Sequence, residues 1–62
     1  MPDRLQKIGF LAQALHRERK RLKPINPQFS FYERLFAKAI DNEDWLNNLY
    51  AHVVAAGGFK GL

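Results

Sequence analysis

The sequence predicts a small all-α protein, a three-helix bundle in which a long basic first helix precedes a helical hairpin. Apolar residues recur at three- and four-residue spacings in three segments, which is the pattern of amphipathic helices. Prolines and a glycine pair separate or end these segments. With 62 residues the chain has room for one domain over 1–62, and its apolar content of 47% is ordinary for a globular protein.

We expect the first helix over residues of about 3–22. Asp3 can serve as its N-cap, and Pro24 ends it because the residue before a proline avoids the α region. One apolar stripe runs along this helix and is expected to face the core. Its members are Leu5, Ile8, Leu11, Ala12, Leu15 and Leu22.

Residues 24–28 contain two prolines, which fix φ and favour a stiff connector over helix. The second helix is expected over about 31–40, because Ser30 and Glu33 have the spacing of a capping box. An acidic break at 41–44 then caps a third helix.

The third helix is expected over about 43–56. Glu43 and Asp44 are favourably placed at the positive end of its dipole. Gly57-Gly58 should end it, since glycine adopts the left-handed conformation at low cost. Residues 58–62 are predicted to form a flexible tail that either frays or packs Phe59 and Leu62 against the bundle.

The predicted core draws on all three helices. Its central residues are expected to be Leu5, Ile8, Leu15, Leu35, Phe36, Ile40, Trp45, Leu49 and Val53. Further buried positions are expected at Phe31 and Ala39 in the second helix and at Leu46, Tyr50 and Val54 in the third.

Positive charge is concentrated at one end of the chain. Residues 1–23 contain seven Lys/Arg and two Asp/Glu, a net charge of +5, whereas residues 24–62 contain three and four, a net charge of −1. Such asymmetry concerns partners and solubility, not fold. It directs attention to the first helix.

Several cations of the first helix are predicted to lie opposite the apolar stripe, with an aromatic side chain beside them. Cations on one helix face can neutralise phosphates and release counterions, and an aromatic ring can stack on a base. We therefore predict non-specific contact with nucleic acid through Lys7, Phe10, Arg17, Lys20, Arg21 and Lys23. The ordinary alternatives are that late cations only favour the negative end of the helix, and that Phe10 packs on Trp45 or Tyr50.

Two other classes of binding protein compete with this hypothesis. The apolar stripe and the aromatics could join a protein partner or a second copy of the chain, because self-association is a common remedy for a small core. A basic helix lying on an anionic membrane surface ranks below both. A helix-turn-helix reader is disfavoured, since Glu43 and Asp44 would meet phosphates at the start of the third helix.

Enzyme chemistry is not expected. The only histidines are His16 and His52, the only serine is Ser30, and there is no cysteine. We predict no catalytic residue, no metal, no cofactor and no small-molecule substrate. No apolar run approaches the roughly 20 residues of a membrane span, and we expect a cytoplasmic accessory or regulatory protein.

Overall fold

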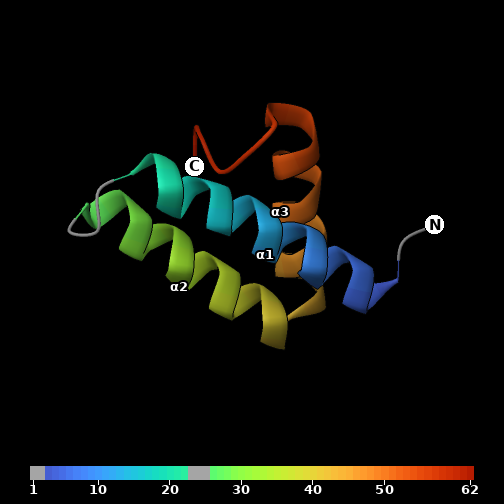
Figure 1. Ribbon diagram of the computed structural model, residues 1–62. Coiled ribbons are helices and arrows are strands. Elements are labelled where there is room, and N and C mark those ends of the chain that lie inside the picture. Colours follow the sequence, from blue (N-terminus) through green and yellow to red (C-terminus); the bar gives the residue numbers. More distant parts are fainter. Residues whose placement is uncertain (1–2, 23–25) are drawn as a thin grey trace.

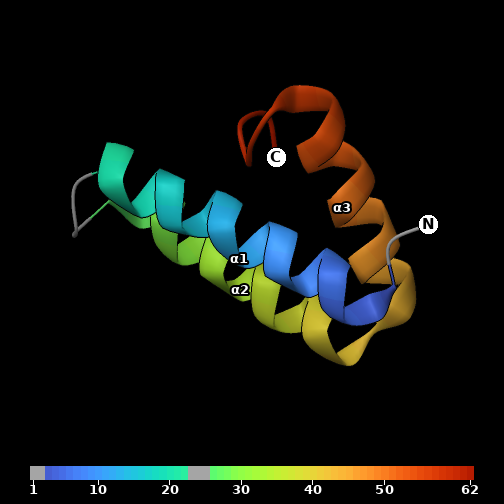
Figure 2. The same ribbon diagram turned by 45° about the vertical axis from the view of Figure 1, so that its right-hand side comes forward.

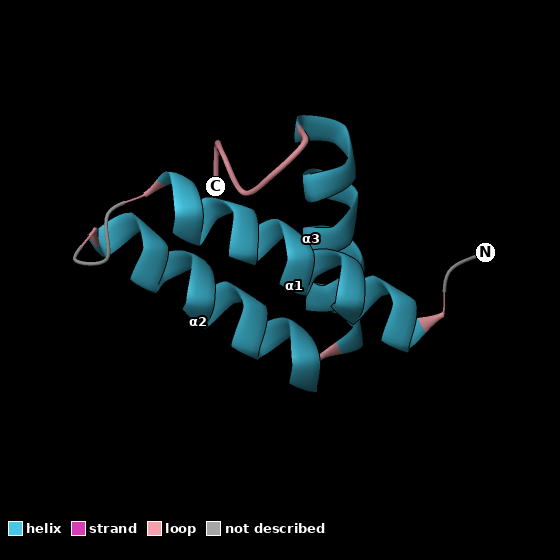
Figure 3. Ribbon diagram, viewed as in Figure 1, coloured by secondary structure: helices cyan, strands magenta, loops and turns pink. Residues whose placement is uncertain are grey.

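The protein is all-α, as predicted. The computed structural model describes residues 3–22 and 26–62 and contains three helices: α1 (Arg4–Arg21), α2 (Pro27–Asp41) and α3 (Glu43–Ala56). Helices α1 and α2 lie side by side and antiparallel, and α3 crosses them (Figures 1 and 2). Figure 3 shows only helices and loops over the described residues.

Helix α1 begins as expected at an Asp3 cap. The backbone N–H of Gln6 donates to Asp3 Oδ1 at 2.8 Å, and the Asp3 N–H donates to Gln6 Oε1 at 3.1 Å. This reciprocal pair is a capping box that satisfies two free donors of the first turn. At the other end Leu22 is the C-cap, and the stop expected at Pro24 lies outside the described residues.

Helix α2 begins earlier than predicted. Its N-cap is Asn26, whose side-chain oxygen accepts from the Gln28 N–H at 2.8 Å, and Pro27 is the first helical residue. A proline at this position loses no helical hydrogen bond, and its fixed φ suits the first turn. The capping box expected at Ser30 was therefore wrong, because Ser30 already lies inside the helix.

The predicted ends of α3 are confirmed. Asn42, within the acidic break, caps the helix by accepting from the Trp45 N–H at 3.2 Å, and Glu43 and Asp44 occupy the first turn. At the far end Gly57 adopts a left-handed φ of 77°, and its N–H donates to the Val53 carbonyl at 2.9 Å. The chain turns back toward α1 and α2 from this point (Figure 1).

The core is built from aliphatic and aromatic residues that come from all three helices and from the C-terminal segment. Leu49 and Val53 are buried as predicted, and Ile8, Leu15, Leu35 and Phe36 pack against the core while remaining partly exposed. The residues at the centre of the core are Leu11, Ala14, Tyr32, Ala39, Leu46, Leu49, Val53 and Phe59.

Several predicted core residues were wrong. Leu5 is 75% exposed, and Phe31, Trp45 and Val54 are also exposed. In α1 the inward face is turned by roughly 60° from the predicted stripe, at about 100° per residue. That rotation replaces Leu5 with Ala14 and Glu18 at the packed surface.

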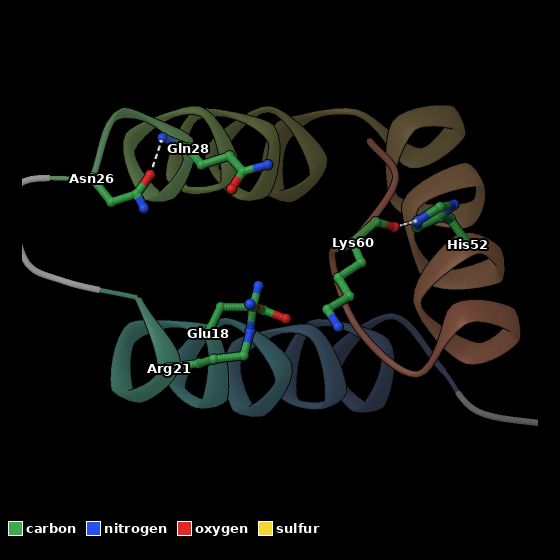
Figure 4. A network of polar contacts seen from close by, with 6 residues as sticks. All are labelled: Glu18, Arg21, Asn26, Gln28, His52 and Lys60. Carbon is green, nitrogen blue, oxygen red and sulfur yellow. Dashed lines mark hydrogen bonds and ion pairs between the residues drawn. The ribbon is translucent and has the colours of Figure 1, made fainter.

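The C-terminal segment is packed onto the helices. The Phe59 side chain is fully buried and its ring centroid lies 5.3 Å from that of Tyr32 in α2. The Nε2–H of His52 in α3 donates to the Lys60 carbonyl at 2.6 Å (Figure 4). The sequence left open whether this segment frays or packs against the bundle. Phe59 packs against the bundle, whereas Leu62 is exposed.

Among the described residues, no helix combines the length and apolar character needed to cross a bilayer.

Candidate nucleic-acid interface

Lys7 faces the bundle and does not lie opposite it, so this part of the predicted site was placed wrongly. Its ammonium donates to Asn47 Oδ1 of α3 at 2.7 Å and lies 5.8 Å from the centroid of the Tyr50 ring. Both contacts join α1 to α3. Lys7 is therefore a packing residue as well as a charge at the edge of the candidate surface.

Arg21 is held by Glu18, three residues earlier on α1. Its Nε and Nη2 atoms donate to Glu18 Oε2 at 3.0 and 2.6 Å, and the two side chains are shown in Figure 4. The Arg21 side chain is 45% exposed, whereas that of Glu18 is 9% exposed. Half of Arg21 thus remains at the surface while its partner is covered.

Glu18 lies beneath the C-terminal segment. A Cβ atom placed on Gly58 would stand 3.0 Å from Glu18 Oε1, so the absence of a side chain at Gly58 lets the carboxylate fit. Glu18 is the only Asp or Glu within α1. Its burial leaves the exposed surface of this helix without a carboxylate.

Phe10, Gln13, Arg17 and Lys20 form one continuous row along the exposed side of α1, which we call the α1 row. They are spaced three, four and three residues apart, and such positions stack along one helix face. Among the described residues one ion pair occurs, and it joins Arg21 to Glu18. Arg17 and Lys20 therefore carry charges that this pairing does not offset.

The aromatic end of the α1 row meets α3. The ring centroids of Phe10 and Tyr50 lie 5.2 Å apart with an interplanar angle of 66°, an edge-to-face contact. Phe10 nevertheless remains 36% exposed. The expected alternative of Phe10 packing on Tyr50 is thus what the structure shows, and the ring still reaches solvent.

The structure divides five of the six predicted site residues into three groups. Phe10, Arg17 and Lys20 lie together in the α1 row, Arg21 flanks it in a salt bridge, and Lys7 is bonded to α3. Lys23 lies outside the described residues.

Two features of the surface were missed by sequence reasoning. Tyr50 was expected in the core and as a packing alternative for Phe10, but its contact with Lys7 at the edge of the candidate surface was not foreseen. Glu18 was counted only in the net charge of residues 1–23, although its spacing of three from Arg21 is a recognised signal for a helical ion pair. Its burial depends on Gly58, forty residues away, and no local pattern carries that information.

The described residues contain no group of three or more His, Asp or Glu side chains that could hold a metal ion. His16 is exposed, and the His52 ring is hydrogen-bonded to the chain itself.

The fold and surface together define a class of protein: a small all-α three-helix domain with a basic helix on its surface. In comparisons with known proteins, no family model, curated protein or solved structure matches the chain.

Proposed function

We propose that this chain is a small non-enzymatic binding protein that contacts nucleic acid through the exposed side of α1, without sequence specificity. We further propose an accessory or regulatory role in the cytoplasm. The residues that would contact phosphates are Arg17 and Lys20, with Arg21 beside them.

One observation carries this proposal: the sole carboxylate of α1 is buried and bonded to Arg21, while Arg17, Arg19 and Lys20 are exposed. A surface of cations without interspersed acids attracts polyanions, because phosphates release counterions on binding. Cations late in a helix also complement its dipole, but that effect is confined to the last turn. It gives no reason for Arg17, which lies more than a turn from the end of α1.

The direct test is a titration of the labelled protein with mixed-sequence nucleic acid at low and near-physiological salt, followed by fluorescence anisotropy. We expect affinity that falls steeply with salt. Replacing Arg17 and Lys20 with glutamine should remove two phosphate contacts and lower the log–log salt slope by about 1.4 for a single strand, at about 0.7 per contact.

Lys38→Gln is the matched control for this titration, since Lys38 belongs to α2 and lies over the Trp45 ring at 4.6 Å. Lys38→Gln removes one positive charge, the same change that each of the Arg17 and Lys20 substitutions makes. It should leave most of the affinity for nucleic acid intact. Absence of binding at low salt, or an equal loss in the control, would contradict the proposal.

A second candidate function is self-association, favoured by the exposure of Leu5. Leu5, Gly9 and Ala12 are spaced four and three residues apart on an outer face of α1, and all three are exposed. A Cβ atom on Gly9 would meet nothing within 4 Å, so this face is open to another helix. Small residues there would permit the close approach that helix pairing requires.

Sedimentation equilibrium over a range of protein concentrations tests this second candidate. Gly9→Gln should weaken a dimer built on this face without disturbing the monomer, whereas Ala55→Gln on the exposed side of α3 should not. A chain that stays monomeric at all accessible concentrations would remove self-association from consideration.

A further inference from the structure

The α1 row places an aromatic ring on the same side of one helix as two cations, Arg17 and Lys20, that form no ion pair among the described residues. Phe10 and Arg17 are separated by seven residues, or about 10 Å along the helix axis. That distance corresponds to about three nucleotides at the 3.4 Å rise of a stacked strand. A strand that runs along α1 can therefore place a base on Phe10. Phosphates about three nucleotides away in the same strand would then lie next to Arg17 and Lys20.

The geometry of the Phe10–Tyr50 pair leaves ring surface available for stacking. In an edge-to-face contact one ring presents its edge, so the contact itself covers at most one face of either ring. The interplanar angle of 66° and the 36% exposure of Phe10 agree with an open ring surface on Phe10. Within the pair, the Lys7 ammonium lies 5.8 Å from the Tyr50 centroid, so Phe10 is the ring that offers the open surface. The Trp45 ring has the Lys38 ammonium at 4.6 Å from its centroid.

We propose that the ligand of this surface is a single-stranded nucleic acid, DNA or RNA, with a base stacked on the Phe10–Tyr50 pair and phosphates held by Arg17 and Lys20. This inference rests on the proposed function and names the kind of strand that the same site takes. Base–aromatic stacking is tolerant of sequence, because every base has a π-face.

A duplex fits this arrangement less well. Paired bases present only their edges in the grooves, so an aromatic ring gains nothing from them unless it is wedged between base pairs. Such a wedge must project deeply from the surface. The Phe10 ring is instead held against Tyr50, whose helix is tied to α1 by the bond between Lys7 and Asn47.

Phe31 offers a matched control within the same chain. It is also exposed, at 40%, but its neighbours on α2 include both Glu33 and Arg34. The α1 row has no exposed acid on its helix. A Phe→Leu change at either position keeps an apolar side chain and removes the aromatic face.

The experiment compares three probes of equal length by anisotropy: a single-stranded oligothymidine or oligouridine, a mixed-sequence duplex, and a base-free deoxyribose-phosphate strand. We expect the base-containing single strand to bind the wild-type protein about tenfold more tightly than the base-free strand. That is the change in affinity that one stacked base supplies. The duplex should bind more weakly than the single strands.

Phe10→Leu should bring the affinity ratio of base-containing to base-free strand close to one and leave base-free binding unchanged. Phe31→Leu should keep the wild-type ratio. Any one of three results would overturn the inference: a wild-type affinity ratio near one, tighter binding of the duplex than of the single strand, or an unchanged ratio in Phe10→Leu. Salt-dependent binding in the same experiment would still support the proposed function. Failure of all three probes to bind at low salt would overturn both.

Discussion

The inner and outer sides of α1 carry similar residues but have different surroundings. Leu11 is fully buried, whereas Leu5 is 75% exposed. Lys7 is bonded to α3, while Arg17 is exposed. The identity of a side chain on this helix therefore does not determine whether it supports the fold or is available to a ligand; its angular position relative to α2 and α3 does.

The largest expected effect comes from comparing leucine substitutions on the two sides of α1. Leu11→Ala should lower the free energy of unfolding by about 2–5 kcal/mol, because it removes a fully buried side chain and leaves a cavity. Leu5→Ala should change it by less than about 0.5 kcal/mol, since little surface is buried there. Urea unfolding followed by circular dichroism measures both values, and a similar cost for the two would contradict the orientation of α1.

Two cation substitutions test the difference at polar positions. Lys7→Gln should cost about 1 kcal/mol of stability through loss of its hydrogen bond to Asn47 and its contact with Tyr50. Arg17→Gln should leave stability nearly unchanged but weaken nucleic-acid binding. Unfolding and anisotropy measurements on both variants separate the roles, and the assignment fails if Lys7→Gln changes binding more than Arg17→Gln does.

The smallest expected change in stability concerns Gly9, a residue on the outer side of α1. Gly9→Ala should raise the free energy of unfolding by about 0.5–1 kcal/mol, because glycine is costly inside a helix and the added Cβ meets nothing. The same change at Gly57, where φ is 77°, should be destabilising. Thermal denaturation of the two variants should show melting temperatures shifted in opposite directions.

Local signals predicted much of the fold. The Asp3 cap and the left-handed Gly57 each depend on a few neighbouring residues, and both are present. The break expected at 41–44 is present but consists of Asn42 alone, between α2 and α3. The start of α2 was misplaced because two local signals competed, and the cap at Asn26 prevailed over that at Ser30.

The orientation of α1 could not be read from its own residues. Its leucine stripe is a good amphipathic pattern, but the helix packs with Lys7 and Glu18 turned inward. Lys7 donates a hydrogen bond there to Asn47. Glu18 accepts hydrogen bonds from Arg21, and its carboxylate fits in the space beside Gly58. Asn47 and Gly58 belong to other parts of the chain, and only Arg21 lies on α1 itself. The sequence therefore predicted that basic residues of the first helix form the candidate site, but it did not predict which of them are exposed.

The position of Trp45 has a consequence for how unfolding of this chain is observed. It is the only tryptophan, it is 39% exposed, and the Lys38 ammonium lies over its ring. Its fluorescence therefore reports on the corner between α2 and α3, whereas the buried Tyr32–Phe59 pair occupies the core. Agreement between the tryptophan signal and far-ultraviolet dichroism would establish that the corner and the helices melt as one cooperative unit.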